Sequence, residues 1–283
     1  MTLTPISPSI IGEREKFLIY GDPGTGKTFD ALTAPAPIFF LAIGGSNEAK
    51  TYYSQQFQKK HGKKEIFISV AEEELGDEGR VDSPVGFDRA CTLLDEALES
   101  DDKGEVEFAT IVVDNATVLS EYQMNKVIEI SHMGAVSKGK DTSGTAYQKY
   151  QDSGLLVPFD SDWGATQSLM SKFTSWLFRI NKHIVFIAHE YQETVTNRMQ
   201  QSREITGIKP LFIGNQRGRV ANMFDNVWRK TKSGQFYVAR TVPLDRPYPV
   251  IAKTRVGGIL PEDYQNVDLT DAIEQLQDHA KGL

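Results

Sequence analysis

The sequence has little of what disulfide-bonded, membrane and zinc proteins depend on. Cys91 is the single cysteine among 283 residues, so no disulfide can form within the chain. No apolar run approaches the roughly 20 residues that a membrane span needs. Residues 1–8 lack the charged and apolar regions of a secretory signal. No second histidine or cysteine lies at ligand spacing from His189. We therefore expect a soluble protein of a reducing cytoplasm, with no membrane partner.

Charge is distributed unevenly along the chain. The net charge of −7 argues weakly against a nucleic-acid partner. Residues 71–107 hold 14 acidic and 3 basic side chains, whereas residues 197–240 hold 9 basic side chains against Glu204 and Asp225. An acidic chain can still present one basic surface to a polyanion. Composition alone does not distinguish such a surface from charges scattered over the fold.

The strongest signal is a glycine-rich motif that follows the apolar run 17–20. The pattern G-x-x-x-x-G-K-[ST] is filled by Gly21, Asp22, Pro23, Gly24, Thr25, Gly26, Lys27 and Thr28. In such a loop the backbone N–H groups face phosphate oxygens, and the helix that follows adds its positive end. Lys27 would bind the β- and γ-phosphates, and the Thr28 hydroxyl would bind Mg²⁺. We predict that these residues and Phe29 bind ATP with Mg²⁺.

Apolar runs alternate with amphipathic stretches over most of the chain, and several runs are apolar on both faces, as in buried parallel strands. The order predicts an α/β doubly wound sheet. The predicted strands are 17–20, 38–42, 66–70, 110–114 and 183–188, and the predicted helices are 28–32, 85–99, 116–131 and 165–180.

The last third of the chain predicts antiparallel strands added to this sheet. Ser233-Gly234 reads as a two-residue hairpin turn between strands at 226–232 and 235–240, and 248–255 reads as a further strand. Thr270 is a candidate cap for a final helix, whose expected buried residues are Ala272, Ile273 and Leu276. Two polar stretches, 132–163 and 190–216, predict long loops. With no repeat or linker we expect one domain over 1–283, with a core at about 15–266 and a last helix at about 269–281.

Further candidate catalytic residues follow later strands. Asp114 ends the run 110–114, as in a Walker B element, and would bind Mg²⁺ opposite Thr28. The next residue is Asn115, where many related ATPases carry a catalytic glutamate. His189 follows the run 183–188, at the strand end where ligands bind in such sheets. It would sense the γ-phosphate, or it is a histidine with a structural hydrogen bond.

Lys253 and Arg255 stand two residues apart on a predicted strand, so both point to one face. Such a pair can reach the γ-phosphate bound by a neighbouring subunit and stabilise the transition state. The alternative is an exposed edge strand protected by charge.

With these elements in order, the chain resembles the RecA-like P-loop ATPases. More narrowly it resembles the phage nucleotide-binding proteins that include RecA-core single-strand annealing proteins. The resemblance rests on GDPGTGKT, TIVVDN, HIVFIAHE, IKPLFIGNQRGRVANMFDNVWR and YPVIAKTRVGGILPE, between Glu15 and Asn266. It implies a homo-oligomer, ring or filament, with ATP between subunits. It assigns Lys253 and Arg255 to the lysine–arginine finger and His189 to coupling between the γ-phosphate and DNA.

The resemblance also implies that single-stranded DNA lies along an inner surface, facing 132–163 and 190–216. The candidate DNA-binding residues are Tyr147, Lys149, Tyr150, Arg198 and Arg203. Relatives usually carry a glutamate just after the second strand, where this chain has Ile43-Gly44-Gly45. Glu48 is a candidate substitute, and without it hydrolysis would be slow.

Three functions therefore stay open. The first is a DNA-dependent ATPase that promotes annealing or strand exchange in phage-type recombination, in the host cytoplasm, with a single-strand-binding protein as a further candidate partner. The second is a replicative helicase or a helicase loader. The third is a nucleotide-dependent interaction module with little turnover, which the missing glutamate favours.

Overall fold

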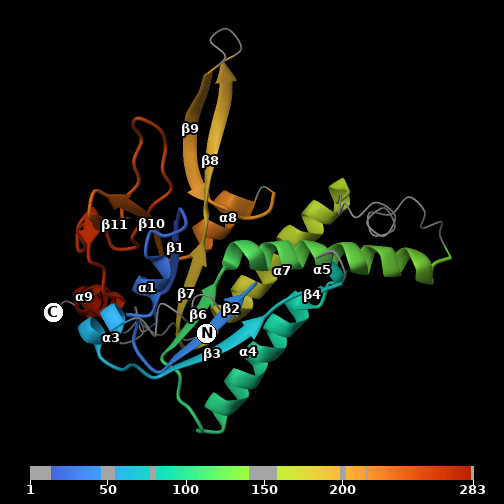
Figure 1. The fold of residues 1–283 in the computed structure, drawn as a ribbon, viewed down its shortest axis with the longest axis horizontal. Helices are drawn as coiled ribbons and strands as arrows, with labels where there is room; N and C mark the ends of the chain where they lie inside the picture. The colour runs from blue at the N-terminus through green and yellow to red at the C-terminus, as the bar shows by residue number, and fades with distance from the viewer. Residues whose placement is uncertain are drawn as a thin grey trace, which may run out of the picture.

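An eight-stranded sheet forms the centre of the computed structural model, which describes residues 14–45, 55–76, 81–139, 158–197, 202–214 and 216–281 (Figure 1). Its strands lie in the order β12-β11-β10-β1-β7-β6-β2-β3. The six strands from β10 to β3 are parallel, and β11 and β12 add antiparallel pairs at one edge. The strands are β1 Lys16–Gly21, β2 Ile38–Ile43, β3 Ile66–Ala71, β6 Thr110–Asp114, β7 His183–Ala188, β10 Asn226–Ser233, β11 Phe236–Arg240 and β12 Asp263–Gln265. This is the predicted α/β fold.

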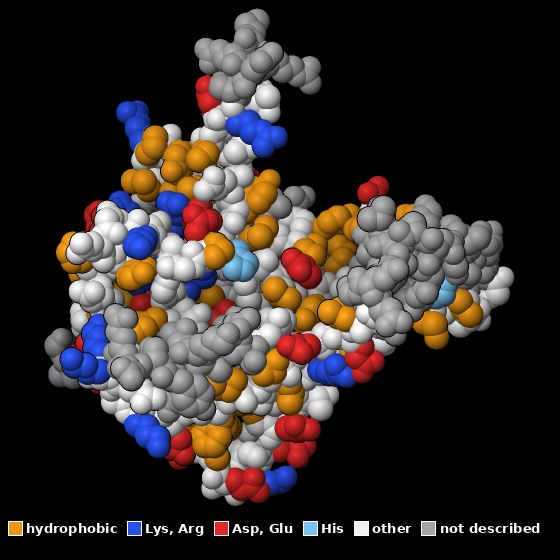
Figure 2. Space-filling model, viewed as in Figure 1, with side chains coloured by type: hydrophobic (Ala, Val, Ile, Leu, Met, Phe, Trp, Pro, Cys, Tyr) orange, Lys and Arg blue, Asp and Glu red, His pale blue; other side chains and the backbone are white. Residues whose placement is uncertain are grey.

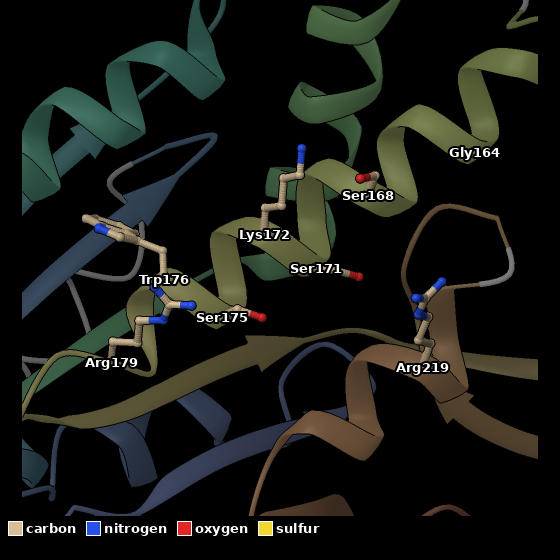
Figure 3. A pocket seen from close by; sticks show the side chains of 8 residues that line it. All are labelled: Gly164, Ser168, Ser171, Lys172, Ser175, Trp176, Arg179 and Arg219. Atoms are coloured by element: carbon tan, nitrogen blue, oxygen red, sulfur yellow. The ribbon is translucent and has the colours of Figure 1, made fainter.

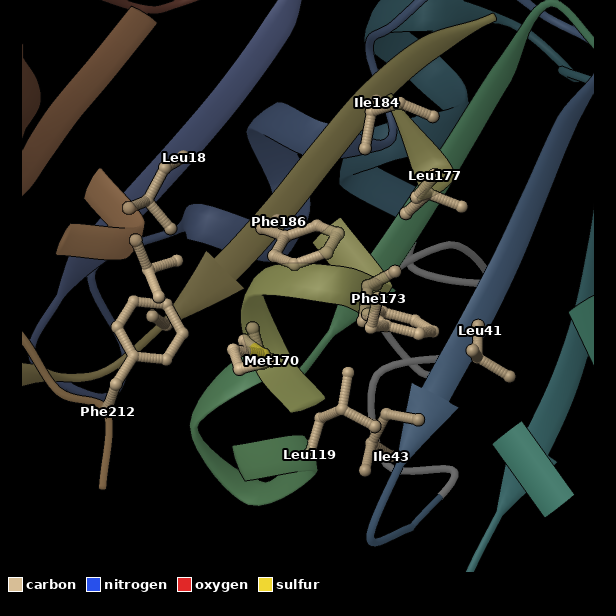
Figure 4. Packing of buried hydrophobic residues seen from close by; sticks show 14 of the residues in the cluster. Leu18, Leu41, Ile43, Leu119, Met170, Phe173, Leu177, Ile184, Phe186 and Phe212 are labelled. Atoms are coloured by element: carbon tan, nitrogen blue, oxygen red, sulfur yellow. The ribbon is translucent and has the colours of Figure 1, made fainter. Parts of the chain in front are cut away.

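Helices cover both faces of the sheet. One face packs against α4 Gly86–Asp102, α5 Ala116–Ser137, α7 Asp160–Leu177 and α8 Gln216–Met223. The other face packs against α1 Lys27–Ala31, α3 Gln55–His61 and α9 Leu269–Lys281. Figure 4 shows the first of these layers, in which Met170, Phe173 and Leu177 of α7 lie against Phe186 of β7.

Alternate residues of the central strands enter the two layers, because side chains of a strand point to opposite faces. In β1, Leu18 and Tyr20 lie in the α7 layer, and Phe17 and Ile19 lie in the α9 layer. All four are fully buried. Burying such a side chain stabilises the fold by about 1.5–3 kcal/mol, so the strand that leads into the glycine-rich loop is held firmly from both sides.

Two predicted features of the last third were wrong. Residues 248–255 form no named strand and make only isolated bridges, such as Lys253 with Val227. The chain here meets the sheet only at such single points, with Lys253 and Val227 exchanging two backbone hydrogen bonds of 2.8 Å. The β10–β11 turn consists of Gly234 and Gln235, since Ser233 pairs with Phe236.

The cap of α9 also differs from the prediction. Asp268 caps the helix: its Oδ1 accepts the Thr270 N–H at 2.9 Å, and Ala272 N–H donates to its carbonyl at 3.0 Å. The hydroxyl of Thr270 instead donates to Thr33 O at 2.7 Å, which ties α9 to the end of α1. Ala272, Ile273 and Leu276 are buried, as predicted.

The predicted loop 190–216 is mostly a hairpin that projects from the sheet. We call it the arm: β8 Glu190–Asn197 pairs antiparallel with β9 Ser202–Pro210 (Figure 1). The predicted loop 132–163 is shortened, because α5 continues to Ser137 and α7 begins at Asp160. A second small hairpin pairs β4 Glu74–Leu75 with β5 Val81–Ser83. Within the described residues, every helix is too short or too polar to cross a membrane.

Candidate functional site

The glycine-rich loop lies between the carboxyl end of β1 and the start of α1, as its motif predicts. A Cβ on Gly21 would stand 2.1 Å from the Lys230 carbonyl, so only glycine lets β10 approach this closely. Gly24 and Gly26 have φ of +75° and +82°, in the left-handed region that glycine enters at little cost. No described atom lies within 4 Å of a Cβ built on Gly24, so this side of the loop is open to a ligand.

The Lys27 side chain is buried inside this loop. Its Nζ donates to Gly21 O at 2.9 Å and to Asp22 O at 2.8 Å. Burial lowers the pKa of Lys27, and the carboxylates of Asp114, Asp22 and Glu190 act in the opposite direction. A buried ammonium satisfied only by carbonyls has room for a stronger anionic partner, which a phosphate supplies.

The metal-binding pair of the prediction is brought together. Thr28 Oγ1 donates to Asp114 Oδ2 at 2.7 Å, although 86 residues separate the two. Together with the glycine loop and His189 they line a cavity of about 410 Å³. A hydroxyl and a carboxylate are oxygen ligands suited to Mg²⁺, and the loop offers backbone N–H groups for phosphate. The donor set therefore fits a magnesium-bound nucleotide.

A match to known proteins decides the family. A family model described as an AAA domain matches residues 13–256. The chain belongs to this AAA domain family. It is thus a P-loop NTPase, of a class that binds and hydrolyses ATP. No curated protein is similar enough to the chain to match it. The narrower resemblance to phage annealing proteins stays a prediction.

His189 lies in the nucleotide cavity of this AAA domain, at the end of β7. Asn115 Oδ1 accepts the Thr117 N–H at 2.8 Å, so the Asn115 Nδ2 is the donor to His189 Nε2, at 2.6 Å. That assignment makes His189 neutral, with its proton on Nδ1. Burial, and then the charge of Lys27, lower the pKa of His189, which also favours the neutral form. Nδ1 is buried and has no partner among the described residues, which leaves a donor for a ligand.

Both ends of the arm are fixed beside this histidine. The His189 N–H donates to Thr117 Oγ1 at 3.0 Å, and the Thr117 hydroxyl donates to Leu211 O at 2.8 Å. Leu211 N–H donates in turn to His189 O at 2.7 Å. Since His189 precedes β8 and Leu211 follows β9, one threonine at the start of α5 holds both roots of the arm.

A buried ion pair adds a second connection at the arm's root. Glu190, the first residue of β8, accepts from Arg229 of β10 through both carboxylate oxygens, at 3.0 and 3.3 Å. The Glu190 side chain is 2% exposed. Removing either partner would leave a buried charge without its pair, which is costly. No local pattern indicates this pair, because its members lie 39 residues apart in the chain.

The two finger residues lie at the opposite edge of the sheet from their own glycine-rich loop. Arg255 Nη1 contacts Asp225 Oδ1 at 2.7 Å, and the Asp225 N–H donates to the carbonyl of Lys16, where β1 begins. Lys253 Nζ donates to Asn222 O at 3.1 Å. The Arg255 side chain is 74% exposed. Arg255 is therefore not placed at its own nucleotide cavity, and its role at a neighbour's γ-phosphate stays a prediction.

Other predicted site residues are not brought to the cavity. Arg203 is exposed on β9 of the arm, opposite Thr196. The remaining candidates lie outside the described residues: Glu48, Tyr147, Lys149, Tyr150 and Arg198. Among the described residues no group of three or more histidine, cysteine or acidic side chains could hold a further metal.

A cationic hollow that the motifs did not indicate lies along α7. Its volume is about 620 Å³, and Figure 3 shows Arg219 of α8 across it from Ser171 and Ser175. The lining residues are Gly164, Ser168, Ser171, Lys172, Ser175, Trp176, Arg179 and Arg219. Three of them are cations and none is acidic. Arg219 belongs to the basic stretch 197–240, and the others carry no recognisable motif.

Proposed function

We propose that this AAA domain protein binds single-stranded DNA in an ATP-dependent way and promotes annealing or strand exchange in phage-type recombination. The observation that carries the proposal is the continuity between the nucleotide cavity and the arm. His189 lines the cavity, and the same residue is bonded through its backbone to both Thr117 and Leu211. A ligand that moves His189 must therefore move both roots of the arm.

Each residue of the cavity has a role in this proposal. Mg²⁺, when bound, would neutralise charge on the β- and γ-phosphates. Thr28 and Asp114 would hold the metal, and Lys27 would exchange its two carbonyl partners for phosphate oxygens. His189 would donate from Nδ1 to the γ-phosphate, while Asn115 fixes its ring. Loss of that phosphate on hydrolysis would remove the contact and release the arm.

Charge complementarity supports a polyanion on the α7 face more than along the described part of the arm. The arm carries Glu190, Glu193 and Glu204 against Arg203 and Lys209, and Figure 2 shows both signs of charge on it. Lys209 is already paired with Glu193 at 2.6 Å.

The cationic hollow offers a better surface for DNA. It combines three cations that form no ion pair among the described residues with the exposed ring of Trp176, on which a base can stack. In our proposal single-stranded DNA lies along α7, and the arm closes over it when ATP is bound.

Fluorescence anisotropy with a labelled oligonucleotide tests the proposal. A non-hydrolysable ATP analogue with Mg²⁺ should strengthen binding by roughly 5–150-fold, the usual range of coupling between two sites. Lys27→Ala should bind the oligonucleotide as the nucleotide-free protein does, with or without the analogue. Equal affinity of the wild type in both conditions would contradict the coupling.

The location on α7 has its own readout. Lys172→Ala, Arg179→Ala and Arg219→Ala should each reduce the slope of log affinity against log salt by about 1, because each removes one phosphate contact. Lys103→Ala is the matched control, since Lys103 is exposed at the end of α4 and does not line the hollow. Unchanged slopes in all three variants would place the DNA elsewhere.

One observation favours a second candidate, an interaction module with little turnover. Asn115 stands where related ATPases carry a glutamate, and the nearby Glu190 has both oxygens occupied by Arg229. ATP turnover stimulated by single-stranded DNA would exclude this candidate.

A further inference from the structure

A second cavity adjoins the phosphate-binding loop on the side of β11 and α9. Its volume is about 520 Å³. It shares Gly26 and Phe29 with the phosphate cavity, so the two spaces meet at the start of α1. A nucleotide whose phosphates lie in the first cavity has its ribose and base within reach of the second.

Aromatic rings form two sides of this cavity. Phe29 is held in place by edge-to-face contacts with Phe57 and His61, at centroid distances of 5.2 and 5.4 Å. Tyr237 reaches over from β11, and its ring carbons stand 3.7–3.8 Å from a Cβ built on Gly26. Tyr237 is 39% exposed although a flat apolar ring gains from being covered. A planar ligand is the natural partner for such rings.

Apart from Val267, the rest of the lining is polar. Lys230 of β10 and Asp30 of α1 form a buried ion pair between the two walls. Asn266 is exposed at the rim with a φ of 50°, a left-handed conformation that asparagine tolerates better than most residues. Its carboxamide offers one donor and one acceptor side by side, the pair that matches the N6 and N7 atoms of adenine.

We infer that this cavity holds the adenine base of the bound triphosphate, stacked against Tyr237 and Phe29, with Asn266 reading the edge of the base. The inference rests on the nucleotide-binding part of the proposed function and adds base selection to it. Selection of adenine over other bases would then depend on residues of three separate segments, α1, β11 and the turn before α9.

Calorimetric titration with two probes tests the base site. AMP-PNP with Mg²⁺ has phosphates and base, whereas inorganic tripolyphosphate with Mg²⁺ has phosphates alone. Tyr237→Ala should weaken AMP-PNP binding by roughly tenfold or more, the loss usual for one base–aromatic stack, and leave tripolyphosphate binding unchanged. Tyr237→Phe should bind both probes as the wild type does, because stacking does not need the hydroxyl.

Phe236→Ala is the matched control. Phe236 precedes Tyr237 on β11 and points to the other face of the strand, so its loss should leave both affinities unchanged. If Tyr237→Ala binds AMP-PNP like the wild type, the base site is refuted while the phosphate site stands. If the wild type binds neither probe, the nucleotide site itself is refuted.

Asn266→Gly tests the reading of the base edge, since glycine keeps the left-handed backbone available. The variant should bind AMP-PNP more weakly than the wild type does and bind GMP-PNP equally well. Its preference for adenine over guanine should therefore be smaller than that of the wild type. A wild type without such a preference would overturn the adenine assignment. Thermal melting of each variant confirms that it is folded.

Discussion

At the scale of single residues, a buried histidine far from the nucleotide cavity makes the stability of the fold depend on pH. His183 begins β7 and is 3% exposed. Its Nδ1 accepts the backbone N–H of Glu15 at 3.0 Å, which only an unprotonated nitrogen can do. Burial, with smaller effects from Arg14 and Lys16, lowers the pKa of His183 to about 4.

This histidine predicts a loss of stability in acid. The ordinary histidine pKa near 6.5 applies to the unfolded chain. The contribution of neutral His183 to the free energy of unfolding is therefore complete above pH 6.5 and is lost as pH falls towards 4. The loss is on the order of 3 kcal/mol. In urea unfolding at pH 7.5, 5.5 and 4.5, His183→Asn should show a smaller decrease than the wild type, since an amide oxygen can accept the same N–H without titrating. Parallel decreases in the two proteins would contradict this.

Sequence reasoning at this scale succeeded where one motif fixed the geometry. Lys27, Thr28, Asp114 and His189 meet in one cavity as predicted, because the ends of parallel strands meet at one edge of a sheet. Residues whose roles come from packing between distant segments were missed. Tyr237 is an example: a tyrosine beside a hairpin turn has no local pattern that places it against Gly26.

At the scale of elements, the arm is the feature that sequence patterns hid. A strand is recognised by alternation of apolar and polar residues when one face is buried. The arm stands away from the sheet, so most residues of β8 are exposed or half-buried, and Val195 is 58% exposed. Without a buried face there is no alternation to detect. The core strands β1 and β7, buried throughout, were predicted to within one residue at each end.

The hydroxyl of Thr117 should couple the nucleotide cavity to the arm. Thr117→Val removes the group that bridges His189 and Leu211, whereas Thr117→Ser keeps it. Both variants should bind the ATP analogue. In hydrogen exchange, the analogue should increase protection of 190–210 in the wild type and in Thr117→Ser, and should have no such effect in Thr117→Val. Equal protection in all three proteins would show that the coupling runs elsewhere.

At the scale of the whole molecule, we propose that the two ends of the sheet have different roles in a homo-oligomer. The glycine-rich loop lies at the carboxyl end of β1, and Arg255 is bound to Asp225 beside the amino end. The Arg255 side of this pair is 74% exposed, although the Asp225 side chain is only 17% exposed, and ion pairs that water reaches are weak. Arg255 can therefore leave Asp225 for a stronger anion. Head-to-tail contact between copies would bring the Arg255 end of one sheet to the nucleotide end of the next.

Mixing two inactive variants tests this arrangement. Lys27→Ala loses its own nucleotide site but keeps Arg255, and Arg255→Ala keeps its site but should lose roughly 10³-fold or more in hydrolysis. A 1:1 mixture should regain about a quarter of wild-type ATPase activity, since half of the sites are intact and half of those face an intact finger. An inactive mixture, or an active Arg255→Ala protein alone, would contradict a finger that acts between subunits.

Strand β10 touches each of these regions in turn. Asp225, just before it, holds Arg255; Arg229 within it holds the root of the arm; and Lys230, one residue later, lines the second cavity. Trp228, next to Arg229, is fully buried against Phe17, which holds this part of the strand in place. In the proposed oligomer, a displacement of β10 would change the contacts of three sites together: the neighbour's triphosphate, the projecting hairpin and the protein's own base pocket. In the proposed oligomer, β10 would then connect a subunit's own nucleotide site with the site of its neighbour.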